Sequence, residues 1–503
     1  MEDENRKSKL DEQGALEGKS VSRREFLKIA GIAGAAVGAG AGLGGLIAAC
    51  GDGATTTTAG ATATTAGATT TTAGATTTTV AASTTTVSTG PEVGREVKLG
   101  FVAPITGGLA MFGIPDNYCV ERATEGIGDG IICADGKKHP VSITLADSQS
   151  LGDRSAQVAG DLINNTKVDI LLAASTADTV VPAAVQAETF GVPCLASDCP
   201  WESFVLGTGQ GDLTKTFKWA YNVFWGAEDV VADFLDMWSQ VPNNKVIGCT
   251  FTNDTDGNAL GPLWMGIYKD LGYTVVDQSG FDHGTEDFTS IISAFKKAGC
   301  EIGTGVMIPP DFTNFWKQAI QQGWTPKIGT YAKPILFPTA IEALGDIGIG
   351  LTTEEWWSPA YPFTSPLLNE TCQQFADEFE KRTNQQWTQP LMHFLVFEWA
   401  VDVLKRTTNL DDKEEIIKNV ASTKMDTICG PVDFSAPVDP VGTPPAPPFK
   451  NGPGHVHPNV WKTPVVGGQW HKGTEHPYEI KIVSNASGAM VPLEEKIEPY
   501  TVS

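Results

Sequence analysis

The sequence is poor in basic residues. Its 503 residues include 35 lysines and arginines against 59 aspartates and glutamates, which gives a formal net charge of −24 at pH 7. Proteins that bind nucleic acid need basic patches to neutralise phosphates, so we expect no nucleic-acid partner. Without its N-terminal region the chain still has about 410 residues, too many for one simple core and suited to two lobes.

The sequence also lacks the short motifs of common enzyme classes. It has no G-x-S-x-G, no H-E-x-x-H, no phosphate loop of the G-x-x-x-x-G-K type, and no G-x-G-x-x-G that opens a helix after a strand. His455 and His457 form an H-x-H pair that could hold a metal, but no cysteine or acid stands at ligand spacing. We therefore expect a protein that is not an enzyme and that needs no metal or other cofactor.

Paired C-x-x-C motifs are absent as well, which argues against thiol-redox or zinc-ribbon chemistry. Apart from Cys50 the chain has eight cysteines, and an even number in an exported domain permits up to four disulfides whose pairing the sequence does not give. Cys249 ends a predicted strand and Cys300 precedes another strand of the same lobe, so we predict that these two are neighbours and candidate bonding partners. Cys372 and Cys429 are a second candidate pair.

The N-terminal region has the features of an export signal. Arg23 and Arg24, in the stretch S-R-R-E-F-L-K, resemble a twin-arginine signal, and an uncharged, Gly- and Ala-rich run follows. "IAAC", which ends at Cys50, resembles a bacterial lipobox, although an ordinary membrane helix is the alternative. We predict a signal peptide over residues 1–49, lipidation of Cys50, and an extracytoplasmic protein anchored to the membrane through that lipid.

Residues 54–90 contain no charged residue and 19 threonines. Such a segment has almost nothing to bury and cannot repay the entropy of folding, so we predict a disordered Thr/Ala/Gly-rich linker over residues 50–92.

Strands and helices alternate through the rest of the chain. Apolar runs suited to buried strands include "VKLGFVA" and "VSITLAD", and helical stretches of crossover length separate them. The alternation starts afresh after Gly226 with "VIGCTF". This pattern predicts an α/β fold of two Rossmann-like lobes with parallel sheets, and ligands of such sheets bind at the carboxyl ends of the strands.

Several stretches together resemble one family. These are "VKLGFVAPITGGLAMFG", "LAASTADTVVPAAVQAETFGVPCLAS", "EDFTSIISAFKKAGC", "TICGPVDFS" and "TPVVGGQW", and the similarity covers roughly residues 96–484. In their order and spacing they resemble the substrate-binding lipoproteins of ABC importers, in the leucine-binding branch of type I periplasmic binding proteins. The resemblance implies a three-stranded hinge, lobes that close on a small-molecule solute, and permease subunits as partners.

With this fold, the expected lobe boundaries are residues 93–222 plus about 352–440 for lobe 1, and 223–351 plus about 441–503 for lobe 2. "EEWWSPAYPF" lies where the chain should cross between them, so Trp356, Trp357 and Tyr361 are either hinge packing or cleft walls. His393 is interpreted as a core histidine.

Candidate ligand contacts in the first lobe follow from the same resemblance. Phe112 stands where the family has an aromatic, although it could simply pack in its turn. Ser175 and Thr176 match hydroxyls that hold the ligand's carboxylate at a helix N-terminus, and they could also cap that helix. Asp198 and Trp201 follow the fourth strand, where the bulky ring departs from the small residues of the family and would shrink the pocket or stack on a flat ligand.

In the second lobe Asp256 falls at about the position of a family tyrosine, and Asp311 either contacts the ligand or caps a helix. After "PKIGT" the amino-acid binders have a carboxylate that pairs with the ligand's ammonium, whereas this chain has "YAKP", with Tyr331 and Lys333. A cation at this position favours an acidic solute, unless another acidic residue of the protein pairs with the ligand's ammonium group. The resulting hypothesis is a solute-binding component of an ABC importer that captures a small carboxylate-bearing solute or amino acid. The alternatives are an exported enzyme and a ligand-sensing receptor protein.

Overall fold

The computed structural model describes residues 90–439 and 452–502. The predicted signal peptide, Cys50 and most of the predicted linker lie outside these ranges. Among the described residues, none of the helices combines the length and the apolar character needed to cross a bilayer.

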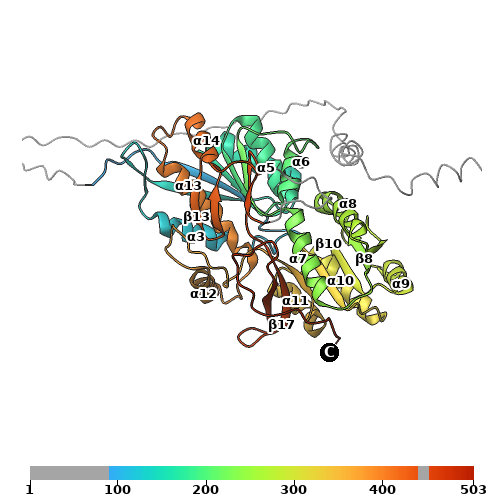
Figure 1. The fold of residues 1–503 in the computed structure, drawn as a ribbon. Helices are drawn as coiled ribbons and strands as arrows, with labels where there is room; N and C mark the ends of the chain where they lie inside the picture. Colours follow the sequence, from blue (N-terminus) through green and yellow to red (C-terminus); the bar gives the residue numbers. More distant parts are fainter. Residues whose placement is uncertain (1–89, 440–451, 503) are drawn as a thin grey trace, which may run out of the picture. The chain divides into compact units, whose positions relative to one another are not determined.

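Two seven-stranded sheets form the framework (Figure 1). The first has the order β15-β16-β7-β6-β5-β1-β4. All its neighbouring strands pair in parallel except β15 with β16. Its strands are β1 (Val97–Ala103), β4 (Val141–Asp147), β5 (Ile170–Ala173), β6 (Cys194–Ser197), β7 (Ala220–Val223), β15 (Gly454–His457) and β16 (Val460–Lys462).

The second sheet has the order β18-β17-β12-β11-β10-β8-β9. Its pairs are parallel from β9 to β12, and β17 and β18 add an antiparallel hairpin at the edge. Its strands are β8 (Val246–Phe251), β9 (Thr274–Asp277), β10 (Ile302–Val306), β11 (Ile328–Ala332), β12 (Thr352–Glu355), β17 (Val466–Lys472) and β18 (Tyr478–Ser484). The predicted pair of α/β lobes is therefore confirmed.

Helices cover both faces of the first sheet. Phe101 packs edge-on against Phe397 of α13, with the ring centroids 5.2 Å apart, whereas Val102 belongs to the cluster formed with α4 and α5. Parallel strands buried on both faces require apolar side chains in succession, which is why these strands read as continuous apolar runs. The helices of this lobe are α3 (Asp116–Ile127), α4 (Gly152–Asp161), which continues as a π-helix (Leu162–Thr166), α5 (Ala177–Phe190), α6 (Trp201–Thr208), α12 (Cys372–Thr383), α13 (Phe394–Lys405), the 3-10 helix Gln389–His393 before it, and α14 (Lys413–Ala421).

The helices packed with the second sheet are α7 (Ala227–Gln240), α8 (Thr255–Asp270), α9 (Thr289–Ala298), α10 (Pro309–Gln321), α11 (Pro338–Leu344) and the 3-10 helix Gly345–Gly348. Two small hairpins complete the fold, namely β2 (Ile131–Ile132) with β3 (Lys138–His139) and β13 (Lys424–Thr427) with β14 (Gly430–Asp433).

The chain passes between the two sheets three times, in the segments 224–226, 356–358 and 463–465. The order of the strands corrects two of the expected lobe boundaries. β12 was expected in lobe 1 but belongs to the second sheet, and β15 and β16 were expected in lobe 2 but extend the first sheet beyond β7. β15 and β16 cover the edge of β7, which would otherwise be exposed. The sequence did not predict this pairing, because strands that lie so far apart along the chain show no local pattern that identifies their partner.

The cysteines also differ from the expectation. All eight in the described residues are buried free thiols. Cys249 and Cys300 lie near enough to interact electrostatically, as do Cys372 and Cys429, but neither pair is bonded. The predicted disulfides are therefore wrong. Burial raises the pKa of all four thiols, so they serve as small apolar core residues.

Candidate functional site

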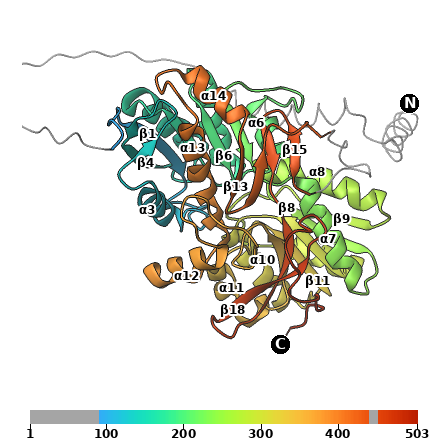
Figure 2. The same ribbon diagram turned by 60° about the vertical axis from the view of Figure 1, so that its left-hand side comes forward.

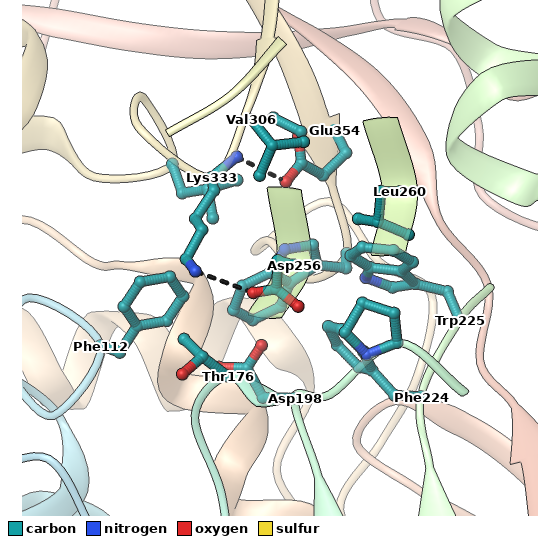
Figure 3. Close-up of a pocket in the computed structure, with 14 residues that line it drawn as sticks. Phe112, Thr176, Asp198, Phe224, Trp225, Asp256, Leu260, Val306, Lys333 and Glu354 are labelled. Carbon is teal, nitrogen blue, oxygen red and sulfur yellow. Dashed lines mark hydrogen bonds and ion pairs between the residues drawn. The ribbon is translucent and has the colours of Figure 1, made fainter. Parts of the chain in front are cut away.

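A cavity lies where the carboxyl ends of the two sheets' strands face each other (Figure 3). Thr176, Asp198 and Phe224 line it from the loops after β5, β6 and β7. Val306 and Lys333 line it from the ends of β10 and β11. Its volume is about 30 Å³, enough for about one water molecule, so the lobes are closed and their side chains nearly fill the space.

Ser175 and Thr176 precede α5 in an unusual backbone conformation. Their φ angles are 84° and 58°, and neither hydroxyl caps the helix or has another hydrogen-bond partner. Both residues are buried. The helix-capping role considered from the sequence is therefore absent in this conformation. Two unpartnered hydroxyls beside the N–H groups at a helix start form a site suited to an anion.

Asp198 belongs to a buried chain of three charged side chains. His393 lies between Asp198 Oδ2, 3.0 Å from Nε2, and Asp116 Oδ1, 2.7 Å from Nδ1. Burial alone would lower the pKa of His393, but the two carboxylates raise it to about 9, so the ring is an imidazolium at neutral pH. Burial raises the pKa of both aspartates. His393 thus holds Asp198, whose φ is 51°, at the wall of the cavity.

This chain of charges predicts a pH dependence of stability. Because the folded pKa of His393 lies above its ordinary value of 6.5, its contribution is fully present below pH 6.5 and is lost as pH rises through 9. A shift of this size corresponds to about 3 kcal/mol. We expect the imidazole NMR signals of His393 to titrate near pH 9 while the free energy of unfolding falls over that interval. Titration near pH 6.5 would contradict the ion-pair assignment.

Lys333 occupies the opposite wall and is already neutralised. Its ammonium lies 2.8 Å from Asp256 Oδ2 and 3.9 Å from Asp178 Oδ2, which belongs to α5 in the other lobe. Although burial alone would lower the pKa of Lys333, Asp256, Asp254 and Asp178 raise it. Burial raises the pKa of Asp256 to about 6 despite the lysine. Lys333 therefore links the lobes across the cavity and fills part of it (Figure 3).

Glu354, at the end of β12, is a cavity residue that sequence reasoning missed. Its Oε1 accepts a hydrogen bond from the Lys333 N–H at 3.0 Å, and its Oε2 accepts one from the Thr353 hydroxyl at 2.8 Å. Burial raises its pKa to about 7. These bonds fix the turn that holds Lys333 at φ 77°. Glu354 could have been predicted from "EEWW", because two acidic residues at the end of a strand that leads into the hinge are unusual for a purely structural segment.

The remaining wall is aromatic. Phe112 lines the cavity and packs edge-on against Phe337, with the ring centroids 4.8 Å apart. Of the aromatics expected at the hinge, Trp356 lines the cavity, whereas Trp357 donates to the Ile428 carbonyl and Tyr361 to the Glu355 carbonyl. The site thus combines charged groups at both lobes with a flat apolar wall, as in pockets for small organic molecules.

Comparison with known proteins decides the family. A family profile described as periplasmic binding protein matches residues 96–444, which is more than half of the chain. This chain belongs to the periplasmic binding protein family. Members of the family bind solutes outside the cytoplasm and are not enzymes.

Among curated relatives, the binding protein is similar to Leu/Ile/Val-binding protein homolog 8 of Brucella abortus (strain 2308), with 22% identity over 240 residues. The match covers 46% of this chain and 56% of the relative, so the chain spans little more than half the length of that relative.

Solved structures share the fold. A leucine-binding protein of Thermotoga maritima has a TM-score of 0.62 at 18% identity, covering 77% of this chain and 99% of that one. A branched-chain amino acid binding protein of Streptococcus pneumoniae in complex with isoleucine gives 0.60 at 14%, covering 76% and 99%. A solute-binding protein of Rhodopseudomonas palustris in complex with 3,4-dihydroxybenzoic acid gives 0.57 at 16%, covering 78% and 99%.

Four predicted contacts do not line the cavity of this binding protein. Ser175 is buried beside the lining residue Thr176, and the other three lie further away. Trp201 donates from Nε1 to Glu228, 3.3 Å away, and packs against Gly226 at the hinge. Asp311 pairs with His283 at 3.0 Å, and Tyr331 is enclosed by the rings of α10. Trp201 and Asp311 follow strands as expected, and Tyr331 lies within β11. The sequence does not give the direction of a side chain, and each of these three side chains packs elsewhere in its lobe.

Both histidines of the H-x-H pair contact backbone carbonyl groups. His455 contacts the Ala436 carbonyl at 2.8 Å and His457 contacts the Lys215 carbonyl at 3.2 Å. Within residues 90–439 and 452–502 of the binding protein, no three His, Cys, Asp or Glu side chains gather in a way that could hold a metal ion.

Proposed function

We propose that this binding protein captures a small zwitterionic solute, an amino acid or a close relative, between its lobes and delivers it to an ABC importer. The proposal rests on two unpartnered hydroxyls, that of the lining residue Thr176 and that of its neighbour Ser175, together with carboxylates that line the inter-lobe cavity from both lobes. One end of the site suits an anion and the other suits a cation.

The anionic end of the solute belongs at Ser175 and Thr176. Their hydroxyls are buried without a hydrogen-bond partner, which is costly unless a ligand supplies one. The N-terminus of α5 behind them adds N–H groups and a favourable dipole for a carboxylate.

The cationic end belongs between Asp198 and Asp256, which line the cavity from different lobes. Each nearby cation is shared by two carboxylates, His393 by Asp116 and Asp198, and Lys333 by Asp256 and Asp178. An excess of negative charge therefore remains for an ammonium group. Since Lys333 is already paired, it no longer favours an acid that lacks an ammonium, and this internal pairing revises the interpretation of "YAKP".

Native mass spectrometry of the protein purified under mild conditions tests this proposal. We expect the folded chain to carry one small zwitterion that is released on unfolding. Recovery of a phosphorylated or purely anionic molecule would contradict the assignment.

The delivery role rests on the family and on the predicted lipobox. The Cys50→Ala variant is expected to move from the membrane fraction to the soluble extracytoplasmic fraction, because lipidation of this residue is the anchor we propose. Ala49→Gly changes the neighbouring residue but keeps the thiol and a small side chain before it, so this matched control should stay membrane-bound. Retention of Cys50→Ala in the membrane would point to an uncleaved N-terminal helix instead.

A further inference from the structure

Lys333 occupies the position that the ammonium group of the solute needs. Its own ammonium lies 2.8 Å from Asp256 Oδ2, and Asp256 is one of the two carboxylates assigned above to the cationic end of the solute. Lys333 lines the cavity and is only 6% exposed (Figure 3). Two ammonium groups cannot take the same position, so the lysine and the solute compete for one carboxylate.

The volume of the cavity leads to the same conclusion. With Lys333 in this position the cavity measures about 30 Å³, which is roughly a tenth of the volume of the smallest typical small-molecule sites. An amino acid does not fit into this space. Binding therefore requires that the lobes separate and that a lining side chain moves away.

The lysine also connects the second lobe to the first. α8 lies beside α5 and α6 of the first lobe, and Figures 1 and 2 show α6 and α8 side by side. The Lys333 ammonium lies 3.9 Å from Asp178 Oδ2 on α5. Asp256 adds a second contact, because the Ser203 hydroxyl of α6 lies 3.4 Å from its Oδ1. The buried pair of Lys333 and Asp256 thus holds the lobes together through protein groups alone.

The side chain of Lys333 can move while its backbone stays in place. Glu354 Oε1 accepts a hydrogen bond from the Lys333 N–H at 3.0 Å, which fixes the turn. The side chain itself is a flexible stem that ends in a compact charge. Asp254, the N-cap of α8, lies near enough to attract that charge, so the ammonium keeps an acidic neighbour when it leaves Asp256.

We propose that Lys333 is a built-in competitor of the solute. Together with Asp256 and Asp178 it forms a latch that holds the lobes closed, and the solute binds by displacing the lysine's ammonium from Asp256. This inference rests on the proposed function, because it requires a solute with an ammonium group. A solute binds more weakly when only a fraction of the protein is in the competent state. Removal of the lysine should therefore raise the affinity for the solute.

The distance between the lobes tests the latch without any solute. Phe112 of the loop after β1 packs against Phe337 at the start of α11, so a label on each of these segments reports opening. Gly108→Cys and Glu342→Cys provide the label sites, since both positions are exposed and a β-carbon at Gly108 contacts nothing. In a Cys50→Ala background these two thiols are the reactive ones, because the eight cysteines of the described residues are buried.

The labelled full chain is unfolded and refolded to remove bound solute and is then measured by double electron–electron resonance. We expect a single short distance with Lys333 present and a longer or broader distribution in Lys333→Met. Asp178→Asn keeps the buried pair and should shift the distribution in the same direction by less. Thermal unfolding checks that the variants fold, and Asp178→Asn carries the test if Lys333→Met does not. A long distance with Lys333 present, or the same distribution in all three proteins, would overturn the proposal.

Calorimetry with leucine and phenylalanine tests the displacement. We expect Lys333→Met to bind the preferred amino acid about tenfold more tightly than the wild type does, because the buried acids then lack their internal cation. Equal or weaker binding by this variant would overturn the displacement.

The control is Lys269→Met at an exposed position of α8, which removes the same charge and should change neither the affinity nor the label distance. If neither amino acid bound to the wild type or to Lys333→Met, the proposed solute would be wrong, and the label distances would still decide whether the latch exists.

Discussion

Replacement of both Ser175 and Thr176 by alanine is expected to weaken binding of the solute by about 2–4 kcal/mol, at roughly 1–2 kcal/mol for each hydrogen bond to a charged group that is lost. The two hydroxyls are buried and unpartnered in the closed structure, so a ligand carboxylate is the acceptor they lack. Alanine keeps the β-carbon, so the strain of the positive φ angles is the same before and after the change. Calorimetry with the copurified solute measures the effect.

Thr189→Ala is the matched control for this pair. Thr189 lies on the same helix, and its hydroxyl donates to the Val185 carbonyl on the exposed side, far from the cavity. Its loss should leave the solute's affinity unchanged. Equal affinity in the wild type and in the double alanine variant would show that the carboxylate does not lie at the start of α5.

The second large effect is expected in stability, from Lys462→Met. Removal of one partner from a buried ion pair costs about 3–5 kcal/mol, because the other charges stay buried without compensation. Lys462 is fully buried and lies 2.6 Å from Glu228 Oε1 and 2.9 Å from Asp229 Oδ1. Burial opposes its charge, but the two acids raise its pKa. The pair joins β16 of the first sheet to the start of α7 at the hinge.

Lys472→Met serves as the control for this change. Lys472 pairs with Asp346 at 3.0 Å, but both side chains are exposed to solvent, so its loss should hardly change the denaturant midpoint. Urea unfolding of both variants measures the difference. Equal midpoints for Lys462→Met and Lys472→Met would mean that the buried hinge pair adds no stability beyond that of a surface pair.

Local patterns predicted the framework of this protein well. The apolar runs around Phe101 and Cys249 form strands of parallel sheets, which are buried on both faces and therefore need apolar residues in succession. The carboxyl ends of parallel strands lie at one edge of the sheet, so the polar residues that follow these strands reach the same edge. Thr176, Asp198 and Lys333 could therefore be placed at the cavity from the sequence.

The partners of these residues could not be predicted. Asp198 contacts His393 across 195 positions, and Lys333 contacts Asp256 across 77, so each pairing depends on the assembled fold. The apolar stretch around His393 indicates a core residue, and the histidine is indeed buried. Its two carboxylate partners, however, make it part of the charge balance of the site.

A calorimetric panel of leucine, phenylalanine, benzoate, a short dicarboxylate and urea tests whether the inter-lobe site holds a zwitterion. We expect at least one of the two amino acids to bind, and benzoate and the dicarboxylate, which lack an ammonium for Asp198 and Asp256, to bind at least tenfold more weakly. If benzoate or the dicarboxylate bound more tightly than both amino acids, the site would not be one for a zwitterion.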